Sequence, residues 1–190
     1  MRVAGVDAYG QVLNVYTGHR RVDGDEPAQP WAVYLAGTDA TFASQSSRAS
    51  AHYGIGATGE IHQYVSELDG SYSDANYASN NSTISIEHAN SGSNPWTVHE
   101  KAIESGAHLV AALCLYYGLG RPEWCKNVFP HRYWSATACP GELAGSQRDH
   151  YMQRAQAWYD AMKSGKAPAP STAKPATAKP AAKRAPRAKA

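Results

Sequence analysis

Alternation of apolar and polar residues predicts strands in the first half of the chain. The segment from Glu60 to Val65 alternates, and a short turn separates it from His52 to Ile55, so the two together predict a β-hairpin. Thr83 to Glu87 alternates in the same way and predicts another strand. The apolar run from Trp31 to Leu35 predicts one more, and residues 12–17 form a weaker strand pattern.

Helical periodicity replaces this alternation in three other segments. Thr97 and Glu100 have the spacing of a capping box and open a helix whose apolar stripe runs to Tyr117, where glycines end it. Residues 39–50 predict a second helix with Asp39 as its N-cap, and residues 147–162 predict a last one. Strands mixed with helices over this length predict an α/β or α+β domain with a central sheet.

The composition changes sharply near Lys163. From Lys163 onward the chain holds eight basic and no acidic side chains, whereas the part before it holds ten Lys and Arg against all 16 Asp and Glu. The end of the chain is rich in Ala, Pro and Lys, so it cannot bury a core and its prolines favour an extended, solvated chain. We therefore divide the chain into a folded domain at residues 1–163 and a disordered basic tail at residues 164–190.

The cysteines and the apolar runs limit the class of protein. Cys114, Cys125 and Cys139 are odd in number and lack paired spacing, which argues against a disulfide framework and leaves room for a metal ligand. No apolar run approaches the length of a membrane span, so we expect no membrane insertion. The first residues lack a compact apolar core followed by a cleavage site, so we expect no Sec-type signal peptide.

Three places offer candidate chemistry, each with a competing structural interpretation. His131 and Cys139 stand eight residues apart in HRYWSATACPG and suit one zinc ion if the loop folds back, although packing alone is the usual role of such a pair. Glu87 ends a predicted strand, where a carboxylate is either solvated or, in a cleft, a general base for a metal-bound water. His52 is either a core histidine, or a hydrogen-bond donor to an oxyanion or an acid/base.

Four segments in order resemble the type-2 N-acetylmuramoyl-L-alanine amidases. They are SAHYGIGATGEIHQYV, NNSTISIEHAN, the helix around HLVAALCLYYGL, and HRYWSATACPG. That family is related in fold to the peptidoglycan recognition proteins and is common among phage lysins. The resemblance runs from about Trp31 to Leu143 and implies an α/β fold, a mixed central β-sheet flanked by helices, with a zinc ion in a groove on one side.

The resemblance also implies a role for each candidate side chain. His131 and Cys139 match two of the family's three zinc ligands, and Glu87 matches the residue that orients or deprotonates the attacking water. His52 and Thr137 would face the oxyanion that develops during the reaction. The Zn²⁺ ion would polarise the amide carbonyl and lower the pKa of its water toward neutrality.

The sequence departs from the family at the third zinc ligand, which is a histidine at the end of the first core strand. In the best match the position falls on Val33 or Tyr34; in a second register, at NVYTGH, it falls on Val15 or Tyr16, and His19 follows. Three alternatives result: a histidine such as His19 reaches the site, Tyr34 binds as a phenolate, or the site is incomplete and the domain binds peptidoglycan without cutting it. The other candidate residues are all present together, which favours catalysis.

These features predict a zinc-dependent hydrolase that cuts the amide bond between N-acetylmuramic acid and L-alanine in bacterial peptidoglycan. We expect a monomeric phage endolysin that stays in the host cytoplasm until it is released to the cell wall. The alternatives are a catalytically degenerate peptidoglycan-binding module and a virion or wall anchor. The basic tail would associate with anionic wall polymers or serve solubility; it has no aromatic residue to stack on bases, so we expect no nucleic-acid partner.

Overall fold

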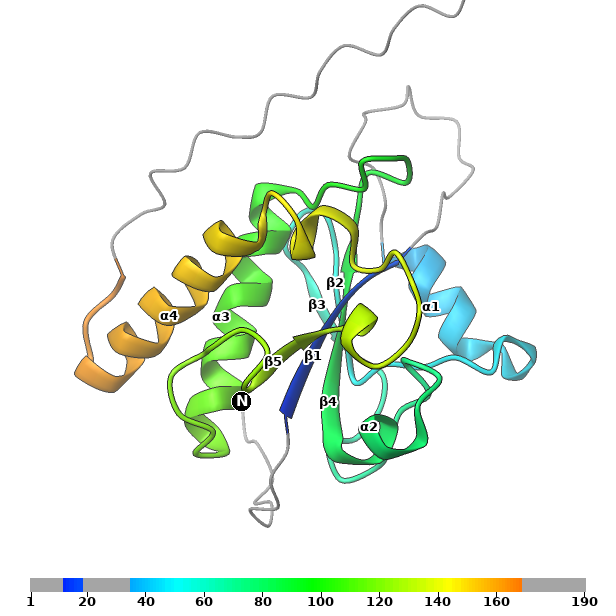
Figure 1. The fold of residues 1–190 in the computed structure, drawn as a ribbon, viewed down its shortest axis with the longest axis horizontal. Helices are drawn as coiled ribbons and strands as arrows, with labels where there is room; N and C mark the ends of the chain where they lie inside the picture. Colours follow the sequence, from blue (N-terminus) through cyan, green and yellow to red (C-terminus); the bar gives the residue numbers. More distant parts are fainter. Residues whose placement is uncertain (1–11, 19–34, 169–190) are drawn as a thin grey trace, which may run out of the picture.

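The computed structural model describes residues 12–18 and 35–168, which include a five-stranded sheet in the order β3-β2-β4-β1-β5 (Figure 1). The strands are Val12–Gly18 (β1), Tyr53–Ile55 (β2), Ile61–Gln63 (β3), Thr83–Ala89 (β4) and Val128–Pro130 (β5). β3 runs antiparallel to β2, and all the other neighbours are parallel. The predicted mixed central sheet is therefore confirmed.

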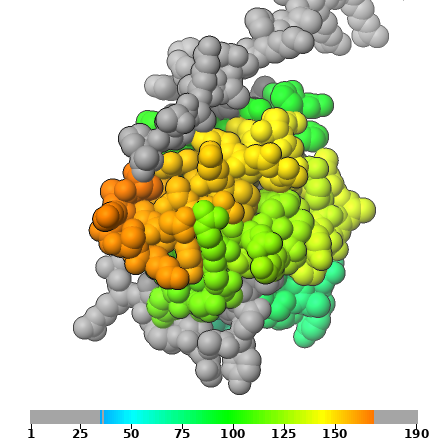
Figure 2. Space-filling model, turned by 60° about the vertical axis from the view of Figure 1, so that its left-hand side comes forward, coloured from blue at the N-terminus to red at the C-terminus, as the bar shows by residue number. Residues whose placement is uncertain are grey.

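Helices cover the sheet on both sides. In the described residues they are Ala36–Ala43 (α1), Tyr77–Ser82 (α2), Glu100–Tyr116 (α3) and Arg148–Ser164 (α4), with short 3-10 turns at Gln45–Ser47 (η1), His131–Tyr133 (η2) and Gly141–Ala144 (η3). α3 and α4 pack side by side on one side of the sheet, and α1 lies on the other (Figure 1). Figure 2 shows α4 in orange on the outer surface of the first side, with α3 in green beside it.

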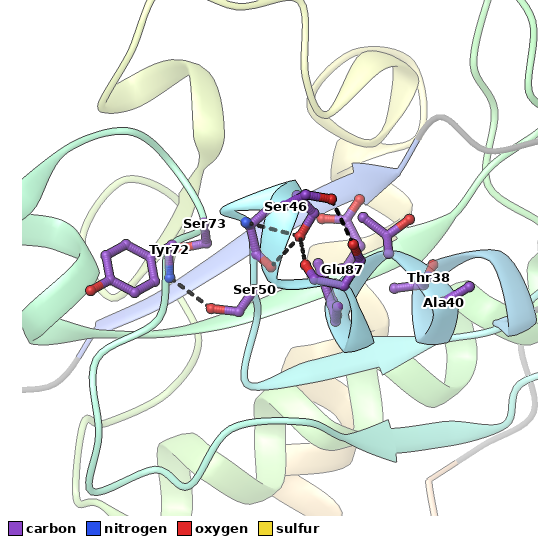
Figure 3. Close-up of a pocket in the computed structure, with 12 residues that line it drawn as sticks. Thr38, Ala40, Ser46, Ser50, Tyr72, Ser73 and Glu87 are labelled. Carbon is purple, nitrogen blue, oxygen red and sulfur yellow. Dashed lines mark hydrogen bonds between the residues drawn. The ribbon is translucent and has the colours of Figure 1, made fainter.

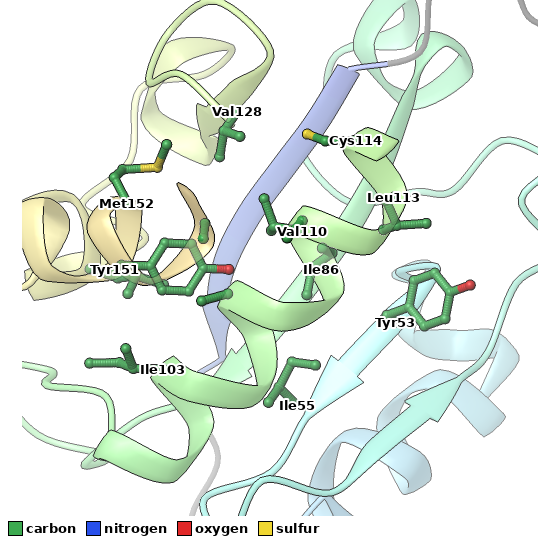
Figure 4. Packing of buried hydrophobic residues seen from close by; sticks show 14 of the residues in the cluster. Tyr53, Ile55, Ile86, Ile103, Val110, Leu113, Cys114, Val128, Tyr151 and Met152 are labelled. Atoms are coloured by element: carbon green, nitrogen blue, oxygen red, sulfur yellow. The ribbon is translucent and has the colours of Figure 1, made fainter. Parts of the chain in front are cut away.

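The hydrophobic core lies between the sheet and the α3–α4 pair. Ile84 and Ile86 of β4 are fully buried there, with Val110 from α3 and Tyr151 from α4 (Figure 4). Because side chains alternate along a strand, the residue after Ile86, Glu87, points to the opposite face, toward α1. The core therefore fixes β4 in the orientation that leaves Glu87 on the open side of the sheet.

The structure confirms most of the predicted elements. The hairpin is β2–β3, the strand at Thr83 is β4, the weak pattern at residues 12–17 is β1, and the last helix is α4. The predicted capping box at Thr97 is wrong, because α3 begins at Glu100 with His99 as its N-cap. The Thr97 carbonyl instead accepts the Ser91 N–H, and the next residue bridges back toward the end of β4, which keeps this segment extended.

The segment before β2 also differs from the prediction. α1 begins at Ala36 with Leu35 as its N-cap, so Asp39 lies in the first turn and is not the cap. Its carboxylate accepts a hydrogen bond of 2.6 Å from the Tyr64 hydroxyl and contacts His62. Of the predicted strand at residues 31–35, only Leu35 lies within the described residues. α2 and β5 were not predicted. Six residues are too few to show a helical period, and β5, although as long as β2 and β3, lacks the alternating hairpin pattern that marked those two strands.

The C-terminal end of α4 lies close to the predicted domain boundary. The helix ends at Ser164, and Gly165 follows with a left-handed φ of 70°. Residues 169–190, most of the predicted tail, lie outside the described residues, so the division into two parts stays a prediction. Within the described ranges, no helix combines the length and the hydropathy that a bilayer span requires.

Candidate active site

A cavity of about 630 Å³ opens on the α1 side of the sheet, with Glu87 in its lining (Figure 3). In Figure 3, Tyr72 and Ser73 lie at one side of the cavity and Thr38 and Ala40 at the other, with Glu87 between them. Hydroxyl groups dominate the wall: Thr38, Thr41, Ser44, Ser46, Ser47, Ser50, Ser73 and the phenol of Tyr72. Such a lining can hydrogen-bond a ligand that is rich in hydroxyl and amide groups.

Glu87 is the acidic side chain in the lining of this cavity. The group is partly accessible from the cavity, yet protein atoms surround it closely enough that burial raises its pKa from the ordinary 4.5 to about 8. A carboxyl group with a pKa near neutrality can take up and release a proton during a reaction. Glu87 therefore has the properties of an acid/base catalyst.

His131 and Cys139 lie at the two ends of a loop that folds back on itself, as the zinc hypothesis requires. The Arg132 N–H donates to the Cys139 carbonyl at 3.2 Å, and the Trp134 N–H donates to the His131 carbonyl at 2.9 Å. Cys139 is buried, and His131 is partly exposed. The structure therefore brings together the two ends of the loop that carry the predicted ligands.

The surroundings of His131 favour a neutral imidazole. Burial lowers its pKa, and the charge and backbone of Asp74 oppose this shift only in part. Asp74 is itself buried and bound locally, since it accepts the Asn76 N–H at 3.1 Å and the Ser79 hydroxyl. A neutral imidazole whose orientation is set by a neighbouring backbone group is the form that binds metal ions.

The sheet register relates Glu87 to His131. β1 lies between β4 and β5, Tyr16 pairs with Glu87, and Val15 pairs with Pro130. His131, the first residue of η2, directly follows Pro130, so the register extrapolated by one residue brings its backbone near the level of Tyr16. Neighbouring strands are about 4.8 Å apart, so the Cα atoms of Glu87 and His131 lie on the order of 10 Å apart across the carboxyl ends of three parallel strands.

Thr137 lies next to the ligand pair but not in the cavity of Glu87. It lines a separate hollow of about 290 Å³ together with Trp96, Arg132 and Glu142. Its hydroxyl oxygen accepts the Cys139 N–H at 3.2 Å, which leaves the hydroxyl hydrogen able to donate to another group. The geometry thus allows the predicted donation to an oxyanion and adds a second role, in shaping the loop.

His52 does not present a ring nitrogen to the cavity. Its Nδ1 accepts the Ser85 N–H at 3.0 Å, so the ring hydrogen is on Nε2, which donates to the Asp69 carbonyl at 2.9 Å. The side chain is only 1% exposed, and burial lowers its pKa. Both nitrogens of this neutral imidazole are occupied by backbone groups, so the predicted role at an oxyanion finds no support in the geometry.

The described residues include two of the predicted metal ligands. Imidazole and thiolate are suitable donors for zinc, and His131 and Cys139 provide one of each. In residues 12–18 and 35–168, no group of three or more His, Cys, Asp or Glu side chains could hold a metal ion. Tyr34 and His19, the two candidates for the third ligand, both lie outside this part of the chain. His88, which directly follows Glu87 in the sequence, is buried beneath α3 and makes a hydrogen bond of 3.3 Å with the Tyr151 hydroxyl.

The structure adds two residues to the surroundings of the candidate site, Tyr72 and Asp74. Tyr72 is 73% exposed at the edge of the cavity, and its N–H donates to the Ser50 hydroxyl at 2.9 Å, which links the Tyr72 loop to the segment that leads into β2. Asp74 follows in the same loop and faces His131. The N-cap of α2 is Asn76, a residue type favoured at that position. It is a local signal in the sequence that the loop before α2 is ordered.

The profile of the N-acetylmuramoyl-L-alanine amidase family matches residues 17–142. A search of curated protein sequences gave no significant match. Solved structures of similar fold include the Staphylococcus aureus hydrolase AmiA in complex with its ligand, with a TM-score of 0.63 at 15% identity over 85% of this chain and 78% of that one. A mutant endolysin from Bacillus subtilis gives 0.58 at 18% identity over 82% and 94%.

A third structure of similar fold is the E. coli amidase AmiD in complex with the substrate anhydro-N-acetylmuramic acid-L-Ala-D-γ-Glu-L-Lys. Its TM-score is 0.57 at 18% identity, over 81% of this chain and 60% of that one. At these identities the structural likeness supports the fold alone, and the sequence profile carries the family assignment.

Proposed function

Because this chain belongs to the N-acetylmuramoyl-L-alanine amidase family, we propose that it hydrolyses the amide bond between N-acetylmuramic acid and L-alanine in bacterial peptidoglycan. The observation that carries the proposal is the relation between Glu87 and His131. A carboxyl group with a pKa of about 8 lies in the lining of an open cavity, level in the sheet with a neutral imidazole two strands away. An acid/base group beside a ligand pair is the arrangement that metal-assisted hydrolysis needs.

We assign the zinc ligands to His131 and Cys139 together with a third side chain. The position of β1 favours His19 over Tyr34 for this place, because His19 directly follows Gly18, the last residue of the strand between β4 and β5. The carboxyl ends of these three parallel strands meet at one edge of the sheet. His19 and Tyr34 lie outside the described residues, and metal analysis of variants at both positions tests the choice.

In the proposed reaction, Glu87 moves the protons. When bound, zinc would polarise the amide carbonyl, acidify the attacking water and favour the ionised form of Glu87. The Glu87 carboxylate takes a proton from the water as its oxygen adds to the carbonyl carbon. The same carboxyl returns the proton to the nitrogen as the carbon–nitrogen bond breaks, which leaves a carboxylic acid on the muramic acid and a free amine on L-alanine. The Thr137 hydroxyl donates to the developing oxyanion.

The assay uses purified cell walls and counts the new amino termini on L-alanine. We expect Glu87→Gln to lower the rate by about 10²–10⁴-fold, the usual contribution of an acid/base group. Cys139→Ser should abolish both the activity and stoichiometric zinc. The matched control is Cys125→Ser, which changes an exposed cysteine in a different loop and should leave the rate unchanged. Protein that sediments with walls and releases no amino termini would instead support the binding-module alternative.

We also propose an endolysin-like role in host lysis. The fold shared with a Bacillus subtilis endolysin supports this role. Expression in a bacterial cytoplasm should leave the cells intact until the inner membrane is permeabilised, after which the culture should clear. Clearing that depends on Glu87 would tie lysis to the amidase reaction, whereas clearing by the Glu87→Gln variant would contradict it.

A further inference from the structure

We propose that Arg132 is a positioning residue for the ligand loop, and that its guanidinium group sets the place of Cys139 relative to His131. The proposal rests on the zinc site proposed above. The sequence analysis gave Arg132 no role, although Arg132 lies between the predicted ligands His131 and Cys139.

The hydrogen bonds of Arg132 all go to the backbone around Cys139. Nε donates to the Cys139 carbonyl at 3.3 Å, and Nη2 donates to the Ala138 carbonyl at 2.6 Å and to the Gly141 carbonyl at 3.2 Å. The backbone N–H of Arg132 adds a bond of 3.2 Å to the same Cys139 carbonyl. One residue therefore holds three carbonyl groups on both sides of the predicted thiolate ligand.

Among the described residues, the guanidinium makes its hydrogen bonds to carbonyl groups, and its interaction with the Glu142 carboxylate is a longer-range electrostatic one. In the described part of the chain, no carboxylate lies within ion-pair distance of it, and the nearby Glu142 carboxylate accepts the Ser146 N–H instead. A planar group with several donors in fixed directions can satisfy carbonyls that point to it from different residues. A lysine ammonium cannot reproduce this fork.

The consequence concerns the geometry of the ligand pair. Arg132 directly follows His131, so its backbone is fixed to one ligand while its side chain holds the backbone of the other. Seven residues, 132–138, lie between them, and all three cysteines of the chain are free. Fixing Cys139 before a metal arrives removes an ordering cost from metal binding, which is how residues behind the ligands of metal sites commonly raise affinity.

Metal titration of the full chain tests the proposal, with Co²⁺ as the probe because a thiolate–cobalt bond absorbs in the near ultraviolet. The parent protein should bind one Co²⁺ with this absorption band. Arg132→Gln should weaken binding by about 10–100-fold, the usual effect of losing a residue that supports a metal ligand. The Co²⁺ affinity of Arg132→Lys should lie between that of the parent and that of Arg132→Gln. The control is Arg121→Gln, which removes an exposed arginine whose partner is Asp160 on α4 and should bind like the parent.

The outcomes separate this inference from the proposed function. If Arg132→Gln and Arg132→Lys bind Co²⁺ as tightly as the parent, Arg132 does not position Cys139, while the zinc site stands. If they lose thermal stability with no change in affinity, the role is structural only and the inference is likewise overturned. If the parent gives no thiolate band, the proposed metal site fails first and the inference with it. Circular dichroism establishes that each variant is folded.

Discussion

Replacing Glu87 by glutamine removes an ionisable group from the cavity and keeps the side chain nearly the same size. In the folded protein, burial raises the pKa of this carboxyl from 4.5 to about 8. Between these two pH values the folded state holds a proton that the unfolded state has released. The free energy of unfolding of the parent protein should therefore fall as the pH rises from 4.5 to 8 and level off above 8.

The size of the effect follows from the pKa. Each pKa unit corresponds to about 1.4 kcal/mol, so a rise from 4.5 to about 8 corresponds to at most ~5 kcal/mol. Solvent reaches the carboxyl from the cavity, which reduces this figure to roughly 2–4 kcal/mol. Glu87→Gln has no proton to lose, so its stability should lack this decline. Below pH 4.5 the two proteins should have nearly the same pH dependence.

Urea unfolding of metal-free protein at a series of pH values measures this difference. A chelator keeps metal out, because a nearby cation would favour the carboxylate and lower its pKa. Glu123→Gln, at an exposed carboxylate, controls for the loss of one negative charge. The comparison uses the slopes against pH, which do not depend on how well the new amide is hydrogen-bonded.

Parallel pH profiles for the parent and Glu87→Gln between pH 4.5 and 8 would refute the reasoning. They would mean that Glu87 ionises as easily in the folded as in the unfolded chain, and so is not desolvated in the cavity. The acid/base role would then lose the property on which it is based. Added zinc should reduce the difference between the profiles of the parent and Glu87→Gln, because a nearby cation favours the Glu87 carboxylate.

Two further predictions concern the scaffold around the site. His52→Ala should lower the free energy of unfolding by about 2–4 kcal/mol in a thermal or urea melt, because it leaves the buried Ser85 N–H and the Asp69 carbonyl without their partner; a loss of activity at unchanged stability would show instead that the ring acts on substrate. Gly106→Ala should destabilise the fold by about 1–3 kcal/mol, because the new Cβ would lie 2.1 Å from His88 Nε2; an unchanged melting temperature would mean that His88 moves freely.

Several features of the site were predictable because they are local. Alternation at Thr83 to Glu87 determined both the strand and the face on which Glu87 lies, since a strand that buries Ile84 and Ile86 must turn Glu87 the other way. The zinc hypothesis for His131 and Cys139 required a loop that folds back, and hydrogen bonds close that loop in the structure. The order of four motifs was sufficient for the family, which the sequence profile confirms.

Other features depended on contacts that no local pattern records. His52 has the sequence context of a catalytic residue, but its partners Ser85 and Asp69 lie 33 and 17 residues away, and only the folded chain brings them to its two nitrogens. The helix start at Thr97 was wrong for the same reason. The Val98 N–H and carbonyl are bound by Gln147, 49 residues further on, which holds the segment extended past the predicted cap.

The sequence by itself determined the family, the mixed sheet and the identity of the candidate acid/base and ligand side chains. The tertiary structure decided which of them meet. Periodicity specifies the face of each strand, because the pleat of a strand is local, but it carries no information on which strands become neighbours or in which register. The pairing of β1 with both β4 and β5 brings Glu87 and His131 to the same end of the sheet. The same pairing makes residues 12–18 the strand whose end adjoins the site.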